Sequence, residues 1–117
     1  MLVAASKYKM TYGVLIDGHS CNSGFHPRGM AVDINGVEKL DGSAKTGDGS
    51  HVTWASKEQP LLKEFYDTMG PVLSSEIGGG GFGQIDCFRG GIKPVRANGV
   101  AYFADTCNHV HMDIGKR

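Results

Sequence analysis

The alternating segment His109 to Asp113, with the sequence HVHMD, limits most strongly how this chain can fold. Side chains of a β-strand point alternately to its two faces, so in an extended segment the two histidines and the aspartate share one face. Val110 and Met112 then share the other face, which suits a hydrophobic core. We therefore predict a central strand over residues 107–114 with one buried face and one polar face.

A second polar cluster lies near the front of the chain, where His26 and Asp33 stand seven positions apart. Gly29 between them allows a tight turn, and Met30 to Ile34 alternates as a strand that carries Asp33 on its polar side. Imidazole nitrogens and carboxylate oxygens form a ligand set that suits zinc, and three protein ligands leave the fourth position for a water. We predict that the two clusters form the two halves of one metal site.

The residues around these clusters resemble the motifs of a known family. Ser23 to Ile34 resembles the His-x6-Asp motif of the D-alanyl-D-alanine metallopeptidase group, which also contains the lysostaphin-type enzymes and the hedgehog signalling domains. The glycine, alanine and aspartate that follow His26 read like H-x-x-G-x-A-x-D, and the segment from His109 to His111 looks like the closing H-x-H. The order and wide separation of the motifs agree with the family's layout across nearly all of the chain.

The resemblance implies a fold, an activity and a set of site residues. The fold would be α+β, with a small antiparallel sheet flanked by helices. One zinc ion would be bound by His26, Asp33 and His111, and His109 would be the catalytic acid/base or transition-state stabiliser. The activity would be that of a zinc metallopeptidase of the D,D-carboxypeptidase, D,D-endopeptidase or L-alanyl-D-glutamate endopeptidase type. Its substrate would be a peptide bond in the stem peptides or cross-links of bacterial peptidoglycan.

Two departures from the family pattern concern the groups around the ligands. Many relatives carry Ser-Gly-Tyr-Arg before the first motif, where this chain has Asp17 to Ser20, so His19 either replaces the arginine or is an ordinary histidine at the edge of a loop. Ser23 and Asp113 are further candidates for contacting the substrate or orienting a ligand. Some relatives use a glutamate at the position of His109. No glutamate lies near this end of the chain, so His109 or Asp113 would transfer any proton.

The cysteines support a competing interpretation. Cys21, Cys87 and Cys107 cannot all pair within one chain, but Cys21 and Cys107 lie near the two motifs and could form a disulfide, sit buried, or bind metal. With His26 and one of the closing histidines they would make a closed Cys2His2 zinc site, which is structural. The protein would then be a non-catalytic binding module. A family member that binds zinc or cell-wall peptide without turnover is a further alternative.

Composition limits the class of protein. A chain of 117 residues is large enough for one core, so residues 1–117 are expected to form a single domain. Twelve basic and twelve acidic residues leave a formal net charge of zero, which argues against a nucleic-acid partner. No secretory signal or membrane-spanning stretch is recognisable, so we expect a soluble protein that reaches the cell wall by secretion or, if phage-encoded, by lysis. Neither motif predicts an oligomeric state.

The remaining segments predict a short helix at the start of the chain, over Leu2–Lys9, and one longer helix. The longer helix, Lys57–Met69, begins with a capping box of Ser56 and Gln59 and ends at Gly70. Further strands are expected at Thr11–Ile16, Val72–Ile77, Gly83–Ile85 and Ala101–Ala104.

Overall fold

The computed structural model describes residues 7–15 and 30–114, which form an α+β fold with a five-stranded sheet and one α-helix. Two short helical segments follow the α-helix, the π-helical η2 and the 3-10 helix η3. The elements are β1 (Tyr8–Leu15), β2 (Met30–Lys39), α2 (Gln59–Val72), η2 (Leu73–Ile77), β3 (Gly80–Phe82), η3 (Ile85–Cys87), β4 (Val100–Tyr102) and β5 (Val110–Ile114).

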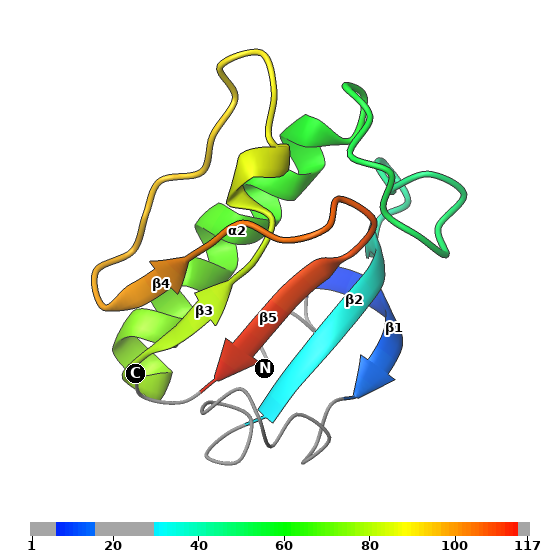
Figure 1. The fold of residues 1–117 in the computed structure, drawn as a ribbon. Helices are drawn as coiled ribbons and strands as arrows, with labels where there is room; N and C mark the ends of the chain where they lie inside the picture. Colours follow the sequence, from blue (N-terminus) through cyan, green and yellow to red (C-terminus); the bar gives the residue numbers. More distant parts are fainter. Residues whose placement is uncertain (1–6, 16–29, 115–117) are drawn as a thin grey trace.

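The strands follow the order β1-β2-β5-β3-β4, so β5 is central, as the sequence predicts (Figure 1). The pairs β1-β2, β2-β5 and β5-β3 are antiparallel, but β3 and β4 are parallel. The sheet is therefore mixed, and the expected purely antiparallel sheet is wrong at this edge. Parallel neighbours need a long crossover connection, and residues 83–99 supply it.

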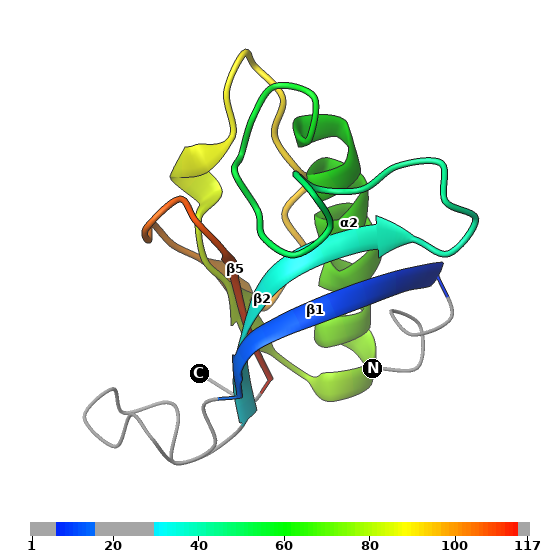
Figure 2. The ribbon, with the colours of Figure 1, turned by 90° about the vertical axis from the view of Figure 1, so that its right-hand side faces the viewer.

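Helix α2 covers one face of the sheet. Figure 2, turned by 90°, shows the helix running along this face. The helix buries a stripe of apolar side chains that meets apolar residues of β2, β3 and β5, and this contact forms the core. The fully buried members include Leu62, Phe65, Tyr66 and Met69 from α2, with Ile34, Phe82, Val110 and Met112 from the sheet.

Both ends of α2 differ from the prediction. No side chain caps its first turn, because Gln59 is buried and its amide donates to the carbonyls of Trp54 and Cys87 instead. The helix also continues through Pro71 and leads into η2. The expected strand over 72–77 is therefore wrong, and Gly78, with a φ of +88°, ends the helical segment.

Strand β1 contains residues 11–15 of the predicted strand but begins earlier, and β3 lies outside its predicted bounds. Tyr8 and Lys9 belong to β1, so the helix expected over residues 2–9 is wrong there, and residues 1–6 lie outside the described chain. Strand β3 lies within the glycine run and not at residues 83–85. A Cβ at Gly80 would stand 2.5 Å from the carbonyl oxygen of Asp113, so the close approach of β3 to β5 requires glycine here.

Candidate functional site

The pairing of β2 with β5 places Asp33 directly opposite His111. Ile34 and Met112, the next residues on each strand, are buried in the core under α2. Since successive side chains alternate, Asp33 and His111 project from the other face of the sheet. The predicted division of β5 into a core face and a polar face is thus present in the structure.

His111 is held between two carboxylates. Its Nε2 lies 2.9 Å from Oδ2 of Asp113, and its Nδ1 lies 3.6 Å from Oδ1 of Asp33. An ionised carboxylate only accepts hydrogen bonds, so the contact with Asp113 places the proton of the neutral imidazole on Nε2. The lone pair of His111 is then on Nδ1, the nitrogen that faces Asp33.

His109 stands immediately before β5, which begins at Val110 and not at residue 107 as predicted. The indole of Trp54 donates to the carbonyl oxygen of His109 at 3.2 Å and fixes the backbone there. The imidazole Nε2 lies 3.5 Å from Oδ1 of Asp33 and 3.8 Å from Oδ2 of Asp105. The same oxygen of Asp33 therefore faces a nitrogen of each of the two histidines.

The positions of Asp33 and His111 fit a zinc ion. Zinc takes nitrogen and oxygen ligands at about 2.0–2.2 Å, which in a tetrahedral site places two ligand atoms about 3.3 Å apart. The observed separation of 3.6 Å between Oδ1 of Asp33 and Nδ1 of His111 is close to that value. Two of the three predicted ligands thus lie at a distance that one ion can bridge.

The third predicted ligand, His26, lies outside the described residues, and so do His19, Ser23 and Cys21. In the sequence the described strand β2, which carries Asp33, begins four residues after His26. Of the predicted site residues, the structure brings together Asp33, His109, His111 and Asp113.

Cys107 forms a disulfide with Cys87. This pairing excludes a disulfide between Cys21 and Cys107, which was one of three possibilities left open by the sequence. It also removes the thiolate that a closed Cys2His2 zinc site would need. With Asp86, the two sulfurs form the one set of three metal-binding side chains within 4.8 Å of one another among residues 7–15 and 30–114. Because both sulfurs are in the disulfide, we do not assign a metal to this set.

Two residues near His109 were not predicted. Gln84, fully buried between β3 and η3, places its amide nitrogen 3.1 Å from Nε2 of His109. Asp105 comes from the loop after β4. Its position four residues before His109 was a usable signal for a carboxylate near the histidine, whereas nothing in the local sequence distinguishes Gln84 from a surface glutamine.

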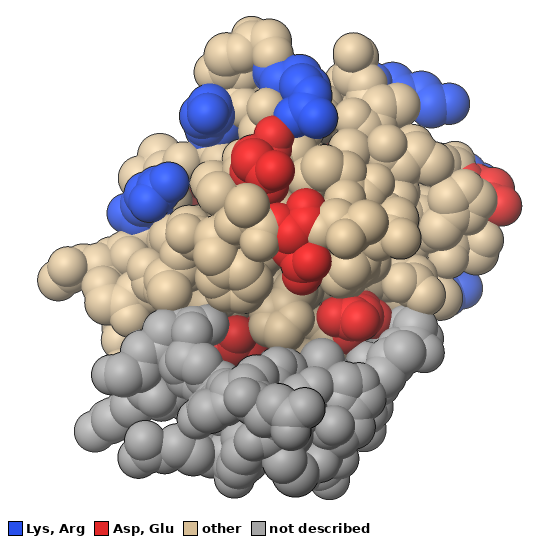
Figure 3. All heavy atoms as spheres, viewed as in Figure 1, with Lys and Arg blue, Asp and Glu red and all other residues tan. Residues whose placement is uncertain are grey.

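The space-filling view shows the distribution of charge on the face of the sheet opposite α2 (Figure 3). Acidic side chains gather along its middle, and the lysine and arginine side chains lie toward its edges. Negative charge gathered in this way attracts cations, including a metal ion. The negative charge on this face and the oxygen and nitrogen atoms of Asp33 and the two histidines thus both favour a metal ion.

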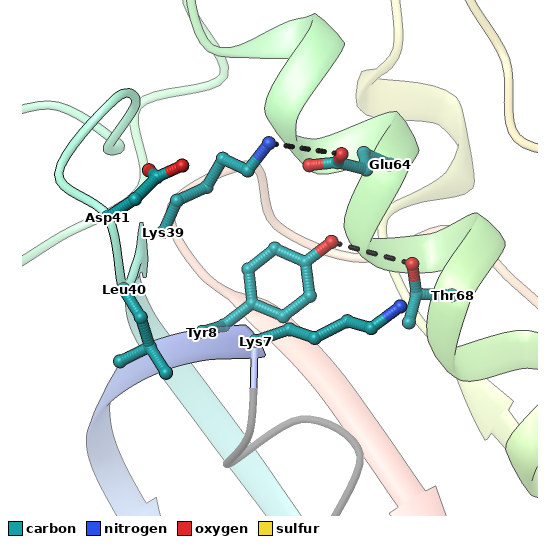
Figure 4. Close-up of a pocket in the computed structure, with 7 residues that line it drawn as sticks. All are labelled: Lys7, Tyr8, Lys39, Leu40, Asp41, Glu64 and Thr68. Atoms are coloured by element: carbon teal, nitrogen blue, oxygen red, sulfur yellow. Dashed lines mark hydrogen bonds and ion pairs between the residues drawn. The ribbon is translucent and has the colours of Figure 1, made fainter.

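A separate hollow of about 320 Å³ lies between α2 and the ends of β1 and β2 and shares no residue with this site (Figure 4). Lys39 reaches Glu64 across it at 3.2 Å, and the hydroxyl of Tyr8 lies 3.4 Å from that of Thr68. These contacts tie the sheet to the helix, so we interpret the hollow as structural.

The chain was compared with protein-family models, curated proteins and solved structures. None of the three comparisons found a match. Within residues 7–15 and 30–114, no helix is long and apolar enough to cross a bilayer.

Proposed function

We propose that this protein is a zinc-dependent peptidase that hydrolyses a peptide bond in bacterial peptidoglycan. The proposed ligands are His26, Asp33 and His111, in a fold of the hedgehog and D-alanyl-D-alanine peptidase type. The observation that carries the proposal is the pairing of Asp33 with His111 across β2 and β5, 3.6 Å apart at their facing atoms. The lone pair of His111 faces this carboxylate because Asp113 engages the other ring nitrogen.

Zinc, when bound, lowers the pKa of a coordinated water toward neutrality and polarises the scissile carbonyl. The protein groups around it would handle the protons. Nε2 of His109 lies 3.5 Å from Oδ1 of the proposed ligand Asp33, and His109 would move a proton between the attacking water and the leaving amine. The carboxylates of Asp33 and Asp105 stabilise the positive charge on the imidazole while it holds that proton.

The substrate class rests on the motifs. The match from Ser23 to Ile34 and the closing H-x-H resemble enzymes that act on stem peptides and cross-links of the cell wall, so the protein would act there after secretion or lysis. Carboxypeptidase, D,D-endopeptidase and L-alanyl-D-glutamate endopeptidase activities release different fragments. Mass spectrometry of peptidoglycan treated with the protein, with and without a chelator, would identify the bond. Binding to peptidoglycan without release of fragments would support the non-catalytic alternative.

A comparison of two histidines tests the metal and catalytic roles. We expect His111→Ala to lose zinc and activity together. His109→Ala should keep one zinc per chain and its melting temperature, and lose about 10²- to 10⁴-fold in turnover. His51→Ala is the matched control, because His51 is an exposed loop residue, and it should match the parent in both properties. A zinc-free His109→Ala, or turnover within a fewfold of the parent, would contradict the role given to His109.

A further inference from the structure

Asp86, Cys87 and Cys107 form a second cluster of metal-binding side chains, separate from the proposed ligands of the zinc site. Each residue contributes one atom, and the carboxylate oxygen and the two sulfurs lie within 4.8 Å of one another. In the disulfide form the sulfurs offer no thiolate, and the thiolate is the form of cysteine that binds metal. The cluster can therefore bind a metal only after the disulfide is reduced.

The two sulfurs differ in their access to a reductant. Cys87 is fully buried, whereas Cys107 lies on the partly exposed turn before β5. A thiolate of an external dithiol can thus attack Sγ of Cys107 and displace the thiolate of Cys87. The second thiol of the reductant then attacks the mixed disulfide and releases Cys107. Two electrons and two protons pass to the protein, and the dithiol becomes a disulfide.

The geometry of the cluster suits zinc once the two sulfurs separate. Zinc binds sulfur at about 2.3 Å and carboxylate oxygen at about 2.1 Å, so a tetrahedral site places sulfur and oxygen about 3.6 Å apart. Oδ1 of Asp86 lies 4.0 Å from Sγ of Cys87, which is close to that value. The same bond lengths require about 3.8 Å between the two sulfurs. The side chain of Cys107 can open this distance because its turn is partly exposed.

Main-chain hydrogen bonds hold Cys87 and Asp86 in place without the disulfide. The N–H of Cys87 donates to the carbonyl oxygen of Gln84 at 2.9 Å, and its own carbonyl oxygen accepts from the buried amide of Gln59 at 3.2 Å. The guanidinium of Arg89 donates to the main-chain oxygen of Asp86, and this contact does not engage the carboxylate. On reduction, two of the three ligands therefore keep their positions, and one movable cysteine completes the set.

We propose that Cys87, Cys107 and Asp86 form a second metal site, which binds a divalent ion such as zinc only in the reduced protein. Two thiolates and one carboxylate hold the ion, and a water takes the fourth position. The disulfide and the metal are then alternative ways to join η3 to the turn before β5. The site does not depend on the proposed peptidase activity, because it uses none of the ligands proposed for that activity.

Titration with Co²⁺ tests the site, because thiolate ligands give this ion an intense charge-transfer absorption in the near ultraviolet that nitrogen and oxygen ligands do not. The protein is reduced with a dithiol, freed of the reductant by anaerobic gel filtration and titrated with Co²⁺. Cys21→Ser is the background throughout, so that any thiolate signal comes from Cys87 and Cys107. We expect the absorption in the reduced protein and not in the oxidised one.

Three substitutions assign the ligands. Cys107→Ser should abolish the absorption. Asp86→Asn should weaken Co²⁺ binding in the reduced protein by at least about 10-fold, because the loss of even an outer partner of a ligand costs that much. The matched control is Asp41→Asn, which removes another exposed aspartate, at the hollow between α2 and β2, and it should bind Co²⁺ as the parent does.

Several outcomes would overturn the proposal. The absence of the absorption from the reduced protein would do so without any variant, and so would equal Co²⁺ affinities of Asp86→Asn and the parent. Circular dichroism shows whether the reduced chain is folded. A chain that stays unfolded after Co²⁺ is added, or an equal absorption in urea, would also overturn it, because the site requires the folded chain.

His111→Ala separates this site from the proposed function. This variant removes a proposed ligand of the peptidase zinc, and it should keep the thiolate absorption of the reduced protein. If the parent cleaves no peptidoglycan, the proposed function fails, and the Co²⁺ titration still decides whether the reduced cysteines bind metal. If His111→Ala abolishes the absorption while the chain stays folded, the second site is not independent and the proposal is wrong.

Discussion

His111 and Asp113 stand two residues apart on β5, and their side chains meet on the face opposite the core with 2.9 Å between Nε2 and Oδ2. Both residues are buried, so water competes little with this contact. Pairs of this kind fix the ring orientation and tautomer of a metal-binding histidine and raise its basicity. In the proposed zinc site, His111 would therefore be a ligand and Asp113 the group that orients it.

The first prediction concerns this pair. Asp113→Ala should weaken zinc binding by about 10- to 100-fold, because the ring of His111 loses its orienting acceptor. Asp113→Asn should lose less zinc affinity, since the amide oxygen of asparagine can still accept a hydrogen bond from Nε2 of His111. Competition with a chromogenic chelator measures both affinities. Affinities of both variants within twofold of the parent would contradict an orienting role for Asp113.

The second prediction concerns the disulfide between Cys87 and Cys107, which joins positions 20 residues apart. A disulfide that closes a loop of this length stabilises the folded state by about 3 kcal/mol, because it lowers the entropy of the unfolded chain. Reduction should lower the melting temperature by roughly 10 °C or more. The Cys107→Ser variant lacks the disulfide, so it should have the lower melting temperature without reductant. Adding reductant should not change that temperature further. Equal melting of the parent with and without reductant would contradict this contribution.

The third prediction concerns Glu58, a fully buried carboxylate before α2. It accepts hydrogen bonds from the backbone N–H groups of Gly47, Thr53 and Trp54 and from the hydroxyl of Thr53, at 2.5–2.9 Å. Glu58→Gln directs an NH₂ group toward some of these donors and should cost about 2–3 kcal/mol in urea unfolding. Glu64→Gln on the exposed side of α2 is the control and should cost less than about 1 kcal/mol. Similar losses in the two variants would contradict a special role for Glu58.

The fourth prediction concerns alkaline pH. Burial raises the pKa of Tyr66 well above its usual value of about 10, and its hydroxyl donates to the carbonyl oxygen of Gly83 at 2.6 Å. In the unfolded chain this tyrosine ionises near pH 10, while in the folded protein it stays protonated. Its contribution to stability is therefore complete below pH 10 and decreases as the pH rises above that value.

Tyr66→Phe tests this dependence. The variant should be less stable than the parent near neutral pH, by about 1 kcal/mol for the lost hydrogen bond. Its stability should fall less steeply than that of the parent between pH 10 and 11.5, as measured by urea unfolding at several pH values. Parallel curves for the two proteins would show that Tyr66 does not cause the alkaline loss.

Much of the polar face could be read from the sequence. The alternation through Val110, His111, Met112 and Asp113 determined which side chains meet the core and which form the site, because the period of a strand is two wherever it lies in a sheet. The apolar stripe of α2 likewise depends on the helical period of 3.6 residues. These features depend only on neighbours along the chain.

The predictions that failed concern contacts between distant segments. The parallel pairing of β3 with β4 and the continuation of α2 through Pro71 each depend on a segment far away in the sequence. The same holds for the partner of Cys107, which the sequence left open. Local propensity favours a strand after Gly70, but the packing of the fully buried Leu73 outweighs it.

The sequence by itself therefore determined that His111 and Asp113 share a face and that Asp33 lies on the polar side of its own strand. The tertiary structure decided that Asp33 stands opposite His111 and that Gln84 reaches His109. The first set follows from the geometry of a single strand. The second set depends on the register of the strands and on one buried amide, which is held by main-chain groups of β5 and of the loop before it. These contacts form only when the whole sheet is assembled.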